Sequence, residues 1–466
     1  MSFDSLEYIV FLPVVCLLHW LTPGKYRWGV LLVASYIFYA SWSPALSLLI
    51  FGVTACSYAV GLLIMRARSP RLRRVWLVCG LAVVLGLLGY FKYFNLIGRG
   101  ILAVTGGTWR TREIVLPVGI SFYTFQAISY MADVYRGKLP AELHLGYYAL
   151  YISFFPQLVA GPIERADGLI RQLRAERFFS RQDTVAGCKL LLSGFFRKIV
   201  IADLLAPFVD AVYRAPQPDG SAVLIATLLF SMQIYCDFSG YSEIAAGSAQ
   251  LLGVRLMRNF DRPYGAVTIR QFWRRWHISL TQWFTDYVYI PLGGSRRGLR
   301  RQLFAQTVVF ALCGLWHGAE WNFVVWGLLH ACFMHLYTLS EALNPRRRPG
   351  AADRAFTLLA VCFAWLFFRA NNLHHAGLLL GQLFSPWQWT AGWDLLMSAA
   401  PQNTPPLALL LLLFGMLLSL RQLPAMLNKN GPAADGAWAG LLIAIGIALL
   451  IRLDAGTASA FIYFQF

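Results

Sequence analysis

Charged residues are scarce in this chain of 466 residues. Asp, Glu, Lys and Arg make up 13% of it, whereas hydrophobic residues make up 58% and the mean hydropathy is +0.55. Soluble globular domains carry roughly 25% charged residues. A chain so rich in apolar side chains is not a disordered one either. The composition therefore predicts an integral membrane protein.

Acidic residues are also fewer than basic ones. The 22 Asp and Glu residues stand against 40 Lys and Arg, which gives a formal net charge of +18. The basic residues cluster in short stretches between apolar runs, around 66–74, 165–181, 296–301 and 346–348. Short Arg-rich loops are typical of the cytoplasmic face of a membrane protein. We therefore expect anionic lipid headgroups, and not nucleic acid, to be the partner of most of these charges.

Several signatures of catalysis and metal binding are absent. The eight cysteines form no CxxC pair, and the chain contains no HExxH, no GxSxG and no P-loop. These absences argue against a zinc hydrolase, a serine hydrolase and a nucleotide-hydrolysing enzyme. A zinc site assembled in three dimensions from His277, His317, Asp286 and Glu320 is the alternative. We expect no metal and no bound cofactor.

Apolar runs that could cross a bilayer, which takes about 20 residues per helix, recur along the whole chain. The sequence predicts an all-α polytopic membrane protein with about ten to thirteen membrane segments, some of them re-entrant. No internal repeat is evident, which argues against an inverted-repeat transporter. The expected spans lie near 6–22, 28–47, 48–65, 75–95, 115–134, 143–160, 187–211, 221–236, 303–316, 321–340, 355–370, 405–420 and 437–452.

We expect a single membrane domain over residues 1–466, with its chemistry in the middle. Residues 1–113 and 341–466 have the composition of lipid-facing scaffold helices. Residues 114–340 interrupt their apolar runs with ionisable side chains such as Asp237. Ionisable residues at membrane depth are costly and usually mark a site or a pathway. Residues 114–340 are therefore predicted to be the catalytic core.

Four of the eight histidines, including His277 and His317, fall between residues 277 and 335. Each of these two follows a tryptophan, and Gly318 after His317 permits close backbone approach. A histidine suits the role of a base in acyl transfer, because its ordinary pKa of about 6.5 lies near the working pH. The alternative is a buried structural histidine. The clustering favours His317 and His277 as catalytic residues.

Supporting residues are predicted in the same segments. Asp286 either orients His277 or forms a structural salt bridge. His330 shares a helix face with Trp326 and either supports the site or only packs there. Trp276, Trp316 and Asn322 are predicted to shape a narrow passage.

The sequence PLGGSRRG at 291–298 is no P-loop, and its glycines indicate a turn. Arg296 and Arg297 follow these glycines. We expect the two guanidinium groups at the cytoplasmic surface. There they could steer an anionic donor, such as the phosphates of coenzyme A.

Long motifs of this chain resemble the membrane-bound O-acyltransferase family. They are RQFWRRWHISLTQWFTDYVYIPLGG and GLWHGAEWNFVVWGLLH. VLPVGISFYTFQAISYMADVYRG, FFPQLVAGPIER, QIYCDFSGYSEIA and the terminal FIYFQF are similar to its bacterial alginate O-acetylase branch. The resemblance covers nearly the whole chain. His317 matches the invariant histidine of the family, and His277 matches its second important histidine.

The resemblance implies a bundle around a central tunnel in the bacterial inner membrane. It implies that an acetyl group arrives as a cytoplasmic thioester, with acetyl-CoA the expected donor. A periplasmic, membrane-associated partner would then place it on an exopolysaccharide of the alginate or cellulose type. One alternative is D-alanyl transfer to teichoic acid from a carrier protein. The other is a transporter without enzymatic activity.

Overall fold

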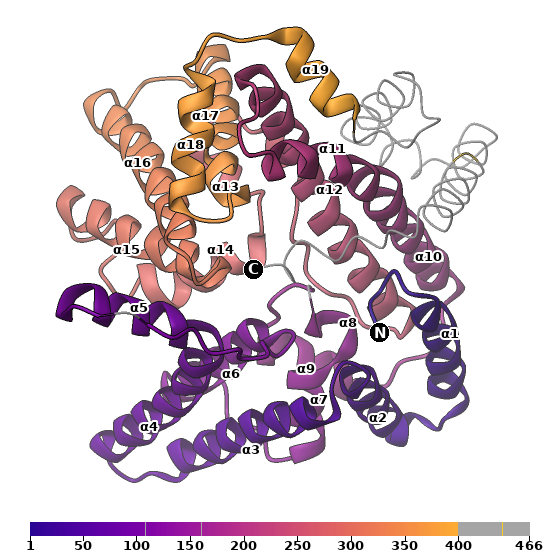
Figure 1. Ribbon diagram of the computed structural model, residues 1–466. Helices are drawn as coiled ribbons and strands as arrows, with labels where there is room; N and C mark the ends of the chain where they lie inside the picture. The colour runs from indigo at the N-terminus through magenta and orange to yellow at the C-terminus, as the bar shows by residue number, and fades with distance from the viewer. Residues whose placement is uncertain (108, 160, 399–439, 441–466) are drawn as a thin grey trace. The chain divides into compact units, whose positions relative to one another are not determined.

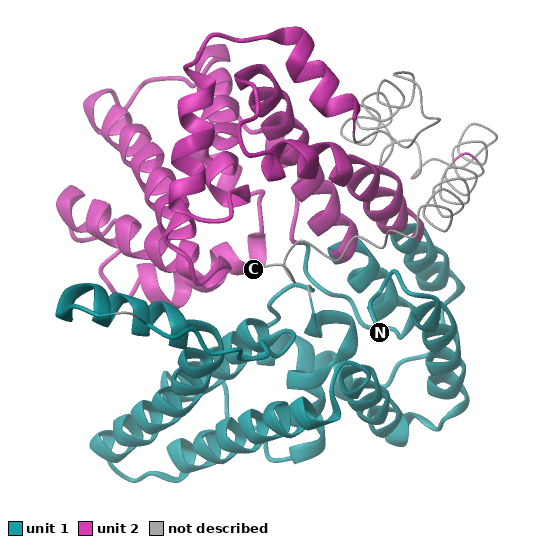
Figure 2. Cartoon of the chain, in the orientation of Figure 1, with its two compact units in different colours: residues 1–191, 242–258 teal, residues 192–241, 259–466 magenta. Residues whose placement is uncertain are grey.

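The computed structural model describes residues 1–107, 109–159, 161–398 and 440. These residues form α-helices joined by turns and short π- and 3-10-helical segments, and they include no β-strand. The expected spans at 405–420 and 437–452 lie outside the described residues. The chain divides into two compact units, residues 1–191 with 242–258 and residues 192–241 with 259–466 (Figure 2). The single catalytic domain stays a prediction.

Unit 1 contains most of the first 191 residues (Figure 1). Its elements are α1 (Leu6–Leu21), η1 (Gly24–Tyr26), α2 (Arg27–Ala40), α3 (Pro44–Arg66), α4 (Pro70–Leu88), η2 (Gly89–Tyr93), α5 (Phe94–Thr105), α6 (Ile120–Tyr135), α7 (Leu145–Ser153), α8 (Phe155–Leu158), α9 (Ala166–Arg174) and the first part of α10 (Arg181–Phe195). The start of α4 shows how the sequence sets a helix boundary. Ser69 caps it by accepting a hydrogen bond from the Leu72 N–H at 3.2 Å, and Pro70 occupies the first helical position.

Helix α6 is the core of unit 1, because nearly all of its side chains are buried. It packs closely on α3 and α4 through two glycines. A Cβ on Gly61 would lie 2.6 Å from the Tyr130 ring, and one on Gly80 would lie 2.7 Å from the Met131 sulfur. Small residues let helices approach in this way inside a membrane.

Unit 2 contains the segments with the histidine-rich motifs (Figure 1). Its elements after the end of α10 are η3 (Phe196–Ala202), α11 (Asp203–Arg214), the part of α12 (Gly220–Leu251) up to Tyr241, η4 (Pro263–Gly265), α13 (Ile269–Trp273), α14 (Ile278–Phe284), η5 (Thr285–Tyr289), α15 (Leu299–His317), α16 (Trp321–Leu343), α17 (Ala351–Arg369), α18 (Leu373–Leu383) and α19 (Trp389–Met397). The segments η3 and η5 are π-helical, a geometry that is frequent at functional sites.

A buried ion-pair cluster joins α12 to η3. The Lys198 Nζ lies 2.8 Å from one carboxylate oxygen of Asp203 and 2.8 Å from one of Asp237. The Lys198 and Asp237 side chains are almost fully shielded from solvent. Gly240 allows this approach, since a Cβ there would lie 2.7 Å from the Gly194 carbonyl oxygen. Buried charges of this kind are tolerated only when they are paired.

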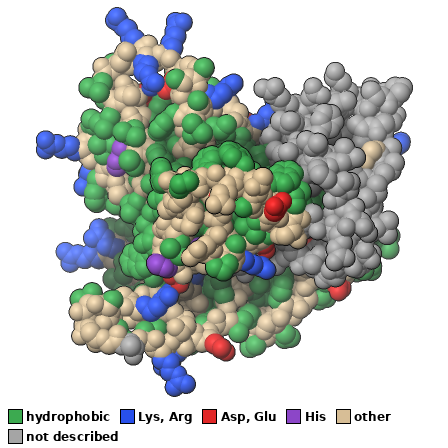
Figure 3. All heavy atoms as spheres, turned by 45° about the horizontal axis from the view of Figure 1, so that its top comes forward, with side chains coloured by type: hydrophobic (Ala, Val, Ile, Leu, Met, Phe, Trp, Pro, Cys, Tyr) green, Lys and Arg blue, Asp and Glu red, His purple; other side chains and the backbone are tan. Residues whose placement is uncertain are grey.

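Five helical segments among the described residues are long and apolar enough to cross a membrane. Large hydrophobic side chains remain exposed along them, such as Leu48 on α3 and Leu359 on α17. Figure 3 shows a face with broad hydrophobic areas, from which Lys and Arg side chains project. The five segments are 44–66, 70–105, 220–251, 321–343 and 351–369, and α1 is a shorter apolar helix. The described part of the chain therefore has the predicted architecture of a helical, multi-pass membrane protein.

A buried carboxyl group in unit 1 makes the stability of the protein depend on pH. Glu164 is 7% exposed, and its Oε1 accepts a hydrogen bond from the Met257 N–H at 2.6 Å. Burial raises the pKa of Glu164 from 4.5 to about 7. The folded state therefore holds a proton that the unfolded chain releases at lower pH. Its contribution to stability is present below pH 4.5 and is lost as the pH rises through 7.

We predict that Glu164→Gln stabilises the protein at pH 8 by about 1–3 kcal/mol and has little effect near pH 4. The glutamine keeps the oxygen that accepts from Met257 and never becomes charged. Thermal unfolding of the detergent-solubilised protein at both pH values measures the difference. Glu176→Gln, on an exposed side chain, is the control. An equal effect of Glu164→Gln at the two pH values would contradict this account.

Candidate active site

His317 lies at the end of α15, inside a cage of aromatic rings. It is 3% exposed. Its ring centroid lies 4.8 Å from that of Trp316, 5.0 Å from that of Trp326 and 5.2 Å from that of Phe368. The three rings belong to α15, α16 and α17. The imidazole is therefore held by three helices in a dry environment, where electrostatic interactions are stronger than in water.

The turn after His317 requires glycine because α15 and α16 approach very closely. A Cβ on Gly318 would lie 2.1 Å from the Phe323 ring, and one on Gly314 would lie 2.2 Å from the Phe323 carbonyl oxygen. The third glycine of this contact is Gly327 on α16, where an added Cβ would lie 2.1 Å from the Phe310 carbonyl oxygen. The close approach that these glycines allow brings the Trp326 ring of α16 against His317.

His277 lies in the turn before α14 and is fully buried. Its φ of 41° is in the left-handed region, which is unusual for a residue with a side chain. The ring centroid lies 4.6 Å from that of Phe238 and 5.6 Å from that of Trp316. Trp316 therefore contacts both His277 and His317. The structure therefore brings together the two histidines that were selected from the sequence, because both contact the indole of Trp316.

The environment of His277 favours its neutral form. Burial lowers the pKa of His277 to about 3. Neither ring nitrogen hydrogen-bonds to any described residue, Asp286 included. A neutral imidazole has one donor and one acceptor to offer to a substrate. Asp286 itself lies on η5 and is partly exposed.

The other predicted supporting residues lie around the two histidines. Asn322 is fully buried and donates hydrogen bonds from its Nδ2 to the carbonyl oxygens of Phe367 at 3.1 Å and Ala370 at 2.7 Å. These bonds tie the start of α16 to the end of α17, next to the Phe368 ring of the cage. Trp276 stacks on Phe272 with ring centroids 5.5 Å apart. Its ring centroid also lies 5.0 Å from that of Trp365.

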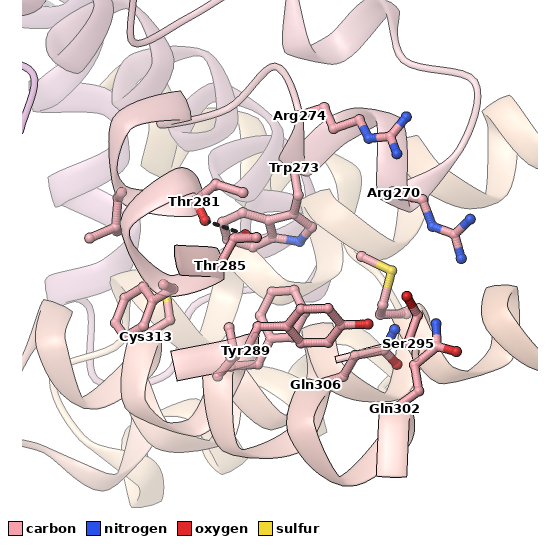
Figure 4. Close-up of a pocket in the computed structure, with 15 residues that line it drawn as sticks. Arg270, Trp273, Arg274, Thr281, Thr285, Tyr289, Ser295, Gln302, Gln306 and Cys313 are labelled. Atoms are coloured by element: carbon pink, nitrogen blue, oxygen red, sulfur yellow. Dashed lines mark hydrogen bonds between the residues drawn. The ribbon is translucent and has the colours of Figure 1, made fainter. Parts of the chain in front are cut away.

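A cavity of about 410 Å³ opens beside this cage (Figure 4). Cys313, one helical turn before His317 on α15, lies at one side of it, and the guanidinium groups of Arg270 and Arg274 lie at the other. Arg270 also pairs with Glu341 at 2.6 Å, whereas Arg274 forms no ion pair with a described residue. The rest of the lining is Trp273, Leu280, Thr281, Phe284, Thr285, Tyr289, Ser295, Gln302, Gln306, Val309, Phe310 and Met334.

The cavity has basic residues that the sequence analysis did not select. Arg270 and Arg274 stand four residues apart in RQFWRRW, and this spacing places them on one face of a helical turn. Arg296 and Arg297 are exposed in the loop after Ser295 and do not line the cavity. The spacing of Arg270 and Arg274 was the signal in the sequence that could have identified them as a pair lining one site. No three His, Cys, Asp or Glu side chains of the described part of the chain gather to hold a metal ion.

The profile of the membrane-bound O-acyltransferase family matches residues 138–370. The chain is 36% identical over 488 residues to a probable alginate O-acetylase AlgI of Pseudomonas putida, with 100% of both chains covered. The chain belongs to the membrane-bound O-acyltransferase family. This acyltransferase is also 36% identical over 508 residues to the probable AlgI of Azotobacter vinelandii, again over the full length of both. A peptidoglycan O-acetyltransferase of Helicobacter pylori is 33% identical to it over 376 residues, 74% of this chain and 71% of the relative.

We predict that Gly318→Ala lowers acyl transfer about 100-fold, because the added methyl group displaces Phe323 and, through it, the Phe368 ring that contacts His317. Transfer of labelled acyl groups by membranes with matched protein levels measures the effect. Gly377→Ala on α18, where a Cβ meets nothing within 4 Å, is the control. Wild-type activity in Gly318→Ala would show that the cage does not need this fit.

Proposed function

We propose that this enzyme moves an acetyl group from a cytoplasmic thioester, acetyl-CoA, across the bacterial inner membrane for O-acetylation of an exopolysaccharide. The full-length similarity to alginate O-acetylases supports an acetyl group and a polysaccharide acceptor. The structure supplies the observation that carries the chemistry. His317, in its aromatic cage, stands one helical turn from the wall of a cavity with basic residues on its other side.

His317 is the base in this proposal. Its imidazole takes the proton of the attacking hydroxyl as the hydroxyl oxygen adds to the thioester carbonyl carbon. The tetrahedral intermediate then expels the thiolate, which receives the proton from the imidazolium. His277, neutral on the other side of Trp316, positions the thioester through a hydrogen bond. Atoms and charge balance without a metal or a bound cofactor.

The donor enters the cavity in this scheme. Arg274 and Arg270 contact the phosphates of coenzyme A, while the apolar lining holds the pantetheine arm. Arg296 and Arg297, exposed after Ser295, attract the anionic donor from a distance. A periplasmic, membrane-associated partner holds the polymer, of the alginate or cellulose type, because the described helices offer no large extramembrane domain for it.

We predict that His317→Ala lowers acetyl transfer by more than about 100-fold, because the hydroxyl loses its base. Membranes receive acetyl-CoA labelled in the acetyl group, and label is counted in the polysaccharide and in periplasmic proteins. His335→Ala is the matched control, since His335 hydrogen-bonds the Leu303 carbonyl oxygen at 3.0 Å and contacts no ring of the cage. Equal transfer by wild type and His317→Ala would remove His317 from the mechanism. Use of carrier-bound D-alanine in place of acetyl-CoA would identify a D-alanyl transferase instead.

We predict that Arg274→Gln raises the KM for acetyl-CoA about 10-fold with little change in kcat, because a charge-assisted contact to the bound donor is lost. Arg297→Gln is the comparison variant. Arg297→Gln is expected to raise the KM for acetyl-CoA only at low ionic strength, because salt screens long-range electrostatic attraction. A KM unchanged by Arg274→Gln at every salt concentration would place the donor elsewhere.

A further inference from the structure

Three rings next to His317 form a buried triangle of polar aromatic residues. Trp273 ends α13, and Trp326 and His330 stand one turn apart on α16. The His330 ring centroid lies 4.9 Å from that of Trp273 and 4.8 Å from that of Trp326, and the two indoles are 5.9 Å apart. None of the three side chains is more than 5% exposed. We call them the ring triangle.

The ring triangle carries hydrogen-bonding groups that the protein does not use. Among the described residues, none pairs with the Nε1 of Trp273, the Nε1 of Trp326 or either ring nitrogen of His330. The neighbouring Trp365 behaves differently, since its Nε1 donates to the Tyr264 hydroxyl at 3.1 Å. Buried N–H groups in native proteins are almost always paired. Several such groups on three rings in mutual contact therefore indicate a ligand that accepts hydrogen bonds.

The position of the ring triangle suggests which ligand this is. Trp273 forms part of the wall of the 410 Å³ cavity. Trp326 contacts His317, with ring centroids 5.0 Å apart, and Trp273, with ring centroids 5.9 Å apart. The rings of the ring triangle therefore connect the cavity wall to His317. Phe272 and Phe310, whose ring centroids lie 6.4 Å and 6.2 Å from that of His330, close the remaining sides with apolar surface.

We propose that the ring triangle binds the carbonyl oxygen of the donor's acyl group, an inference that rests on the thioester donor of the proposed function. Indole N–H groups only donate hydrogen bonds, and a carbonyl oxygen only accepts them, so the two match. When the hydroxyl oxygen attacks the carbonyl carbon, the C=O electron pair moves onto this oxygen. The pair returns as the carbon–sulfur bond breaks and the thiolate leaves with the proton carried by His317.

The ring triangle would contribute most in the transition state. A fixed N–H donor in a dry site stabilises an oxyanion more than it stabilises a neutral carbonyl. Trp273 and Trp326 would touch the reacting oxygen directly. His330 is the positioning residue, because its ring contacts both indoles.

The experiment compares two donor analogues that cannot transfer an acyl group. One is a ketone in which a methylene group replaces the thioester sulfur of acetyl-CoA, and the other is the matching alkyl analogue without the carbonyl oxygen. Calorimetric titration of the purified full chain gives both affinities. We expect the wild type to prefer the ketone about 10-fold, and Trp273→Phe with Trp326→Phe to abolish that preference. The double variant should also lower kcat about 100-fold.

Trp365→Phe is the matched control, because it removes a buried indole N–H that already has a protein partner. It should keep the 10-fold preference. Replacement of Trp326 by benzothienylalanine, which keeps the ring shape and lacks the N–H, separates hydrogen bonding from packing if the phenylalanine variants fold poorly. This replacement should reduce the preference on its own.

The outcomes distinguish the inference from the function on which it rests. A wild type that binds both analogues equally, or a double variant that keeps the wild-type preference, overturns the role of the ring triangle and leaves the acetyl-CoA donor intact. A wild type that binds neither analogue overturns the donor, and the ring triangle falls with it. Loss of the preference in the double variant but not in Trp365→Phe supports the inference.

Discussion

The close contact between α15 and α16 is the constraint on which the rest of the site depends. Three glycines, Gly314, Gly318 and Gly327, remove the side chains that would keep the helices apart. This separation lets the Trp326 ring of α16 contact His317 at the end of α15. Cys313, one turn before His317 on α15, lines the cavity. Cage and cavity therefore share one helix pair, which couples the position of His317 to the shape of the proposed donor site.

Both histidines lie in dry surroundings. Burial lowers the pKa of His277 to about 3, which favours the neutral imidazole, and in the proposed mechanism this ring acts through hydrogen bonds. His317 sits among three aromatic rings that shield it from water. Trp316 lies between them and contacts both. An indole at this position keeps the two imidazoles at a fixed separation, which suits a reaction that needs a base on one side of the acyl group and a positioning group on the other.

The sequence predicted the helical membrane architecture well, because apolar runs and their caps are local signals. The span expected at 6–22 is α1, Leu6–Leu21, with Ser5 as its cap. The span expected at 187–211 is instead α10 and α11 with the π-helical η3 between them. The π-helical segment η3 contains Lys198, which pairs with Asp237. Because Asp237 is distant in the sequence, no local pattern indicated this interruption of the helix. The shared indole of the histidines and the ring triangle were not predictable either, since they join α13, α15 and α16 through contacts that no local pattern records.

The buried Lys198–Asp237 pair also bears on how the chain enters the membrane. A lone carboxylate at the centre of a helix such as α12 is costly to move into hydrocarbon. Lys198 is synthesised first and neutralises Asp237 once η3 and α12 lie together. The two segments are therefore expected to leave the insertion machinery as one unit and not singly. An ion pair that the completed enzyme keeps out of solvent would thus set the order of assembly during biogenesis.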